Sequence, residues 1–165
     1  MKPALIAAIL ALAFTIHAQQ KDTAQTPEHE HAAMMQRGNQ GMGFSQEKTT
    51  HHFRLLQDGG AIEVSANDPK DAASRDQIRA HLAHIAQMFA AGNFSIPMFV
   101  HDTTPPGVPT MRKLRGQIRY RYQETRNGGR VDIRTQDPQA LQAVHQFLCF
   151  QIAEHHTGDS TQMTR

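Results

Sequence analysis

The sequence predicts an α+β fold of two layers, in which a four-stranded antiparallel sheet carries two helices on one face. Two observations support this prediction. Apolar and polar residues alternate on both sides of a glycine pair, once around Gly59-Gly60 and once around Gly128-Gly129, as expected for two β-hairpins. An apolar stripe with helical spacing follows each hairpin. The chain therefore has the order ββα-ββα, with a connector between the two units.

The first unit starts with alternation over residues 53–55 and 62–66, on either side of the first glycine pair. A helix is expected over roughly 71–91, and Gly92 ends it. Residues three or four apart fall on one face of a helix. The stripe of this helix comprises Ile78, Leu82, Ile85 and Phe89.

The second unit repeats this arrangement, with alternation over 118–122 and 131–134 and a helix over roughly 139–156. Its stripe comprises Leu141, Val144, Leu148 and Ile152. An Asp-Pro step, Asp68-Pro69 or Asp137-Pro138, precedes each helix, where aspartate caps the first turn and proline is tolerated.

The two units align without gaps, since glycine pairs, Asp-Pro steps and helices agree in order and spacing. We interpret this agreement as an internal duplication that gives the domain approximate two-fold symmetry. The alternative is a chance match, because hairpins with two glycines are common.

The first 18 residues have the pattern of a secretory signal peptide. Lys2 supplies a positive charge, residues 4–14 are apolar, and Ala18 precedes a polar stretch. A membrane-spanning helix needs about 20 apolar residues, so this segment is too short to remain as an anchor. We expect cleavage near Ala18 and a periplasmic or secreted protein.

The mature chain is expected to contain one domain. Residues 19–47 are rich in Gln, His, Met and Gly without apolar periodicity, and we interpret them as a disordered polar leader. The single α+β domain then covers 48–158, and 159–165 form a flexible tail. No later segment is apolar for long enough to span a bilayer.

Charge and cysteine content narrow the functional classes. The whole chain has 17 Lys and Arg against 15 Asp and Glu, so charge gives no support for a nucleic-acid partner. The single cysteine, Cys149, cannot form an internal disulfide, and the fold must depend on its apolar core. Its place beside the apolar stripe favours a small hydrophobic role over a nucleophilic one.

Several short strings resemble a group of uncharacterised exported bacterial proteins. They include Met42-Gly43-Phe44, Thr49-Thr50-His51-His52-Phe53, His81-Leu82-Ala83-His84-Ile85-Ala86, Pro105-Pro106-Gly107-Val108 and His156-Thr157-Gly158-Asp159. The likeness covers about residues 42–159. It implies an exported bacterial protein and brings no activity or site residue with it.

Histidine is unusually frequent, with 11 in the chain. Neutral imidazole is the commonest metal ligand and suits copper and zinc. His81 and His84 lie three apart on the first helix, His51 shares its strand face with inward residues, and His101 opens the proline-rich loop. These four residues form our candidate site for Cu or Zn. The alternative is that His81 and His84 are ordinary flank residues of the helix.

The other histidines have simpler interpretations. His145 is expected to be a core histidine with a backbone partner, and His155-His156 to be residues that suit a helix C-terminus. The sequence carries no catalytic signature, so we expect a non-enzymatic binding or interaction module of the bacterial cell envelope. Its partner is a metal ion or an unknown envelope protein. The charged outer face of the sheet is one surface for a protein partner, but a plain solvated face is the preferred interpretation. A cofactor-free interaction domain and an enzyme of unknown class are the alternatives.

Overall fold

The sheet is built as the hairpin patterns predict. A computed structural model describes residues 27–163, so the predicted signal peptide at 1–18 lies outside the described residues. The strands are β1 (Thr49–Leu56), β2 (Gly59–Ala66), β3 (Ile118–Thr125) and β4 (Gly128–Thr135). Their order across the sheet is β1-β2-β4-β3, and every neighbouring pair is antiparallel. The prediction of an α+β fold in the order ββα-ββα is confirmed.

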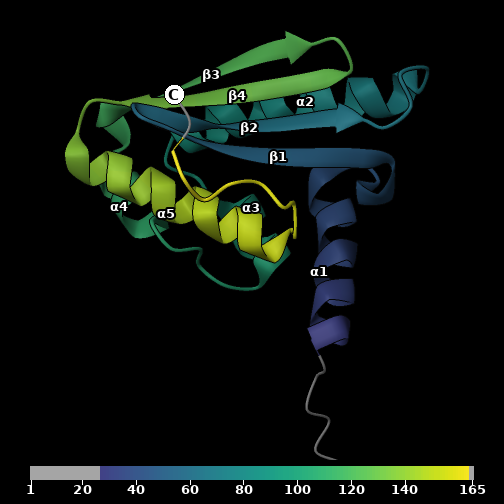
Figure 1. The fold of residues 1–165 in the computed structure, drawn as a ribbon, viewed down its shortest axis with the longest axis horizontal. Helices are drawn as coiled ribbons and strands as arrows, with labels where there is room; N and C mark the ends of the chain where they lie inside the picture. Colours follow the sequence, from purple (N-terminus) through teal and green to yellow (C-terminus); the bar gives the residue numbers. More distant parts are fainter. Residues whose placement is uncertain (1–26, 164–165) are drawn as a thin grey trace, which may run out of the picture.

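Both long helices lie on the same face of the sheet, as Figure 1 shows. They are α2 (Ala72–Ala90) and α5 (Pro138–Glu154), and the predicted stripes face inward on both. All stripe residues are buried except Leu141, which is half-buried. α2 follows β2 but packs mainly over β3 and β4, whereas α5 follows β4 and packs mainly over β1. Each helix therefore covers the hairpin of the other unit.

The glycine pairs make this crossed packing possible. A methyl group on Gly60 would lie 2.1 Å from Cδ1 of Leu148 on α5, and one on Gly129 would lie 3.1 Å from Cδ1 of Leu82 on α2. The first glycine of the second pair, Gly128, faces the backbone of β2 in the same way, with a methyl group 2.1 Å from the Val64 oxygen. Glycine is needed where another backbone or helix approaches this closely.

Helix capping follows the expected chemistry, with one shift. Asp137 caps α5, and its carboxylate accepts a hydrogen bond from the Ala140 N–H at 2.8 Å. In the first unit the cap is Asp71 instead of Asp68, and it accepts from the Ser74 N–H at 3.0 Å. Asp68-Pro69 lies in the turn that precedes this cap.

The connector between the units is packed against the core. It contains α3 (Ser95–His101), α4 (Val108–Lys113) and a short 3-10 helix over Arg115–Gln117. Phe94, Val108 and Met111 are almost fully buried. Gly107, at φ 83°, lets the start of α4 approach the Ala143 backbone of α5, where a methyl group would lie 2.1 Å from the carbonyl oxygen.

The leader was predicted to be disordered over residues 19–47, and from residue 27 on it differs from this prediction, whereas 19–26 lie outside the described residues. Within it, α1 covers Pro27–Met42, and a 3-10 helix covers Gln46–Lys48. Met34 and Phe44 are buried, and Nε of Arg37 donates a hydrogen bond to the Val100 oxygen of α3 at 2.8 Å. A methyl group on Gly38 would lie 2.0 Å from the Gln46 side chain. Glycine at position 38 permits this close packing. The glycine content of the leader was therefore wrongly interpreted as a sign of disorder.

The C-terminal tail, predicted to be flexible from residue 159, also contacts the domain. The Asp159 side chain is 4% exposed and bonds to β1, along which the tail runs in Figure 1.

Among residues 27–163, no helix is long and apolar enough to cross a membrane.

We predict that Gly60→Ala destabilises the fold, because the new methyl group would meet both Leu148 and the Arg54 carbonyl, the latter at 2.5 Å. Overpacking of this kind costs about 1–3 kcal/mol or more. The matched control is Gly116→Ala, whose methyl group would meet nothing within 4 Å. Chemical denaturation should show a clear loss for Gly60→Ala and a change within about 0.5 kcal/mol for the control. Equal stability of the two variants would contradict the crossed packing.

Candidate ligand-binding cavity

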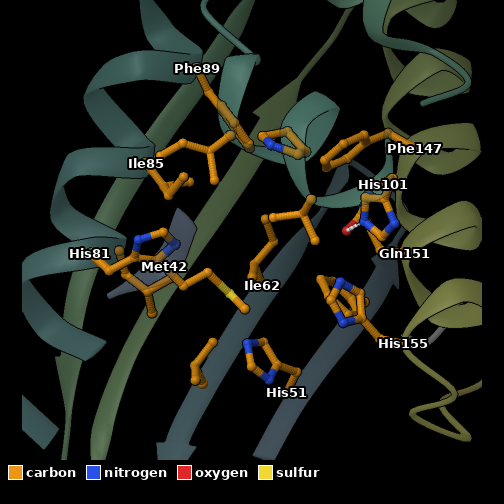
Figure 2. A pocket seen from close by; sticks show the side chains of 16 residues that line it. Met42, His51, Ile62, His81, Ile85, Phe89, His101, Phe147, Gln151 and His155 are labelled. Atoms are coloured by element: carbon orange, nitrogen blue, oxygen red, sulfur yellow. Dashed lines mark hydrogen bonds between the residues drawn. The ribbon is translucent and has the colours of Figure 1, made fainter. Parts of the chain in front are cut away.

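A cavity of about 60 Å³ lies between the two long helices, over the sheet. β1 and β2 form its floor, α2 and α5 form its two walls, and α3 closes it together with the end of α1. Figure 2 shows the Met42 side chain reaching from α1 into the middle of this space. The cavity therefore depends on the connector and on the leader helix as well as on the two ββα units.

Most of the lining is apolar. Phe53 and Ile62 rise from the floor, Ile85 and Phe89 project from α2, and Phe147 projects from α5. These residues belong to the main core, so the cavity is a gap in the core between the two helices. Apolar cavities of this kind bind small apolar molecules when they are accessible.

Four histidines interrupt the apolar lining, each from a different element. His51 comes from β1, His81 from α2, His101 from α3 and His155 from the end of α5. The rings of His51 and His155 are stacked, with centroids 5.5 Å apart and an angle of 12° between planes. The ring of His101 meets that of His155 edge-on at 5.1 Å.

Burial keeps these imidazoles neutral. Loss of solvation is the largest cause that lowers the pKa of His51 to about 4, and the neighbouring His81 and His52 contribute to the same shift. The pKa of His81 also falls to about 4, chiefly through burial and then through neighbouring His84. Burial and the surrounding histidines lower the pKa of His155 to about 3. The cavity therefore presents uncharged rings at neutral pH.

His101 is held by a hydrogen bond across the cavity wall. Its Nε2 lies 3.1 Å from Oε1 of Gln151 on α5, and its side chain is 1% exposed. Because a neutral imidazole has one N–H, donation from Nε2 leaves Nδ1 as an acceptor. Burial lowers the pKa of His101, although the bond to Gln151 and the charge of Glu154 act in the opposite direction.

Three buried polar atoms of the cavity residues have no hydrogen-bond partner in the described part of the chain. They are Nε2 of His51, Nδ1 of His101 and Nε2 of Gln151. The Gln151 amide nitrogen is a donor, the His101 atom is an acceptor, and His51 takes either role. Unpartnered buried polar groups are rare in folded proteins and cost free energy. All three atoms belong to residues that line the cavity, although Nδ1 of His101 also lies 3.8 Å from Oε2 of Glu154.

The structure brings together three of the four predicted metal-binding residues. His51, His81 and His101 line the cavity, whereas His84 lies on the exposed side of α2 and is not part of the lining. Within residues 27–163, no group of three or more histidine, cysteine or acidic residues is arranged to hold a metal ion. The parallel stack of His51 and His155 explains part of this, because in-plane lone pairs of stacked rings do not converge.

The cavity also contains residues that sequence reasoning did not select. His155 was expected only at a helix end, yet it lies one turn beyond Ile152 on the inward stripe, and this spacing was the available signal. Gln151 lies three residues after Leu148, so it also falls on the inward face of α5. Nothing in the sequence indicated Met42, because α1 was not predicted. His145 has the predicted backbone partner, since its Nε2 lies 2.9 Å from the Leu56 and Gly59 oxygens, but it is half-buried and not a core residue.

Comparison with protein-family models, with curated proteins and with solved structures finds no match to this chain. The resemblance to exported bacterial proteins therefore stays a prediction. The functional argument depends on the cavity and the surface of this molecule alone.

We predict that acid weakens the fold through the buried histidines. Because the pKa values of His51, His81 and His155 are lowered in the folded state, the unfolded chain binds more protons below pH 6.5. Stability is then complete above pH 6.5 and is lost as the pH falls toward about 4. Each histidine costs at most about 2 kcal/mol between pH 6.5 and pH 5.

His51→Gln removes one titrating group and should reduce this loss, when the free energy of unfolding is measured by denaturant titration at pH 7.5, 6 and 5. His29→Gln, at an exposed position on α1, is the matched control and should leave the pH dependence unchanged. The same pH dependence in wild type and His51→Gln would contradict burial of a neutral His51.

Proposed function

We propose that the protein is a non-enzymatic binding module of the bacterial cell envelope that takes a small uncharged ligand, or the uncharged end of a longer one, into the cavity between α2 and α5. The observation that carries this proposal is the set of three unpartnered polar atoms, on His51, His101 and Gln151, among otherwise apolar lining. The envelope location depends on the signal-peptide pattern of residues 1–18.

The chemistry of the lining defines the ligand class. Neutral imidazoles and apolar side chains give a charged group no compensating ion pair, so a charged ligand would pay a large desolvation cost. The Gln151 amide nitrogen is available to donate to a carbonyl or hydroxyl oxygen. A cavity of about 60 Å³ is less than half the roughly 150 Å³ of an engineered cavity that binds benzene. The buried part of the ligand therefore has only a few heavy atoms.

Butan-2-one is a suitable probe, because it combines an apolar body with one carbonyl acceptor. We expect it to bind with a dissociation constant on the order of 1 mM, given its few atoms, and to shift the Gln151 side-chain amide in NMR titrations. 2-Methylbut-1-ene has the same shape without the oxygen and should bind more weakly. Gln151→Leu should remove the difference between the two compounds.

The matched control is Gln142→Leu, an exposed glutamine on the same helix, which should leave butan-2-one binding unchanged. The proposal fails if butan-2-one and 2-methylbut-1-ene perturb the wild-type cavity equally. It also fails if neither compound causes saturable shifts at cavity residues.

A second candidate is the binding of copper or zinc, favoured by the presence of His51, His81, His101 and His155 in the lining of one cavity. Met42 adds a thioether, which suits Cu(I). Binding would require the stacked rings of His51 and His155 to rotate, since their present arrangement does not converge on one point.

Titration with Cu(I) and Zn(II) tests this candidate. If metal binds, the melting temperature should rise with metal concentration, and His51→Ala combined with His81→Ala should abolish the rise. His29→Ala, an exposed histidine of α1 away from the cavity lining, is the control. The absence of saturable binding by either metal would remove this candidate and leave the neutral ligand.

A further inference from the structure

The sheet has two edges, formed by β1 and β3, and both present backbone groups on the side away from the sheet. The turn of each hairpin has two residues, so the closing pairs are Leu56 with Gly59 and Thr125 with Gly128. Hydrogen bonding to the neighbouring strand then alternates along each edge strand. On β1, the N–H and C=O groups of Phe53 point outward, and on β3 those of Tyr122 do so.

The chain itself covers the edge of β1 with a carboxylate. Oδ2 of Asp159 accepts a hydrogen bond from the Phe53 N–H at 2.9 Å. Oδ1 accepts from Nη1 of Arg54 at 3.0 Å and lies 2.9 Å from Nδ1 of His52. The Asp159 side chain is 4% exposed, so this is a formed contact and not a loose surface ion pair. It shows how an acidic residue binds to an edge strand of this sheet.

The edge of β3 presents the corresponding groups without such a residue. Tyr122 occupies the position of Phe53, since each lies six residues before the first glycine of its pair. Arg121 and Gln123 stand beside it where His52 and Arg54 stand on β1. Among the described residues, no side chain or tail bonds to the outward N–H of Tyr122. The α2 helix, which follows the first hairpin, leads into the connector and leaves this edge uncovered.

The segment that leads into β3 and includes most of it is basic. Between positions 103 and 123 the sequence contains no acidic residue, although the whole chain has a net charge of only +2. The cations of this segment are all exposed, and none forms an ion pair within the described residues. They are Arg112, Lys113, Arg115, Arg119 and Arg121.

We propose that the free edge of β3 binds an extended acidic segment of a partner protein, which pairs with β3 as a fifth strand and places its carboxylates against Arg119 and Arg121. Strand addition of this kind gains affinity from main-chain hydrogen bonds and selectivity from side chains. A carboxylate beside Arg121 and the Tyr122 N–H would repeat the contact that Asp159 makes on β1. This surface is separate from the cavity, whose floor is β1 and β2.

Charge favours this occupant over a second copy of the chain. Antiparallel pairing of two β3 strands would place the arginines of one copy against those of the other, and like charges on facing strands are destabilising. A nucleic acid would use the cations but not the outward backbone donors and acceptors of β3. An acidic peptide uses both.

The probe is a fluorescent nine-residue peptide of alternating threonine and aspartate, titrated into the full chain. We expect saturable binding, with NMR shifts at the amides of Tyr120, Tyr122 and Glu124. The same peptide with methylated backbone nitrogens at alternate positions should not bind. Arg119→Glu with Arg121→Glu should weaken binding at least about tenfold, because two favourable charge pairs become repulsive.

The matched control is Lys70→Glu with Arg75→Glu, an equal change of charge before and at the start of α2, which should weaken binding much less. No saturable binding of the peptide would overturn the proposal. Equal binding of the methylated peptide, or of a single-stranded oligonucleotide, without shifts at the three β3 amides would show a general polyanion surface and overturn strand addition. Concentration-dependent dimerisation with the same amide shifts would assign the edge to a second copy and would also overturn it.

Discussion

The crossed packing of the two long helices is the interaction on which the rest of the structure depends. α2 lies over the hairpin of the second unit and α5 over that of the first, so neither ββα unit has an apolar core of its own. Gly60 and Gly129 allow this arrangement, since a methyl group on Gly60 would lie 2.1 Å from Leu148 of α5 and one on Gly129 would lie 3.1 Å from Leu82 of α2. The two units therefore fold as one body, with one core shared between them.

The cavity follows from the same geometry. α2 packs mainly over β3 and β4 and α5 mainly over β1, and side chains of α1 and α3 line the space that is left between the two helices. Histidines occupy this boundary because an imidazole packs as a flat apolar ring when it is neutral and still offers a polar atom. Burial lowers the pKa of His51, His81 and His155, so the same residues that line the cavity also make the fold sensitive to acid.

The two sheet edges show how one architecture gives different surfaces. On β1, Asp159 binds the outward Phe53 N–H and neutralises the neighbouring Arg54. On β3, the equivalent backbone position is flanked by Arg121, and the preceding segment adds further positive charge. Arginines on an edge strand disfavour its pairing with a second copy, and in our proposal they favour an acidic strand. The cavity and this edge would thus serve different partners.

The sequence predicted the sheet and the helices well, because the period-2 and helical patterns around Gly59 and Gly128 are local signals. It did not predict α1, since Met34 and Phe44 are isolated apolar residues whose partners lie on distant elements.

The candidate site was predicted in part. His51, His81 and His101 were selected and share the cavity, while His84 is exposed because it lies beyond the inward edge of α2.

His155 and Gln151 were missed for a physical reason. Their role depends on how far α5 extends over β1, and helical spacing alone does not give that distance. The unpartnered atoms are likewise invisible in a sequence, because they are defined by the absence of a neighbour in space.

The central claim is that an accessible, mostly apolar space exists between α2 and α5. Its most direct test is a crystal structure determined under xenon pressure, because xenon binds to apolar cavities that small molecules can enter. The account predicts a xenon atom between α2 and α5, close to Met42 and Ile85 and above β1 and β2. A structure in which these side chains fill the space and no xenon lies between the two helices would contradict it.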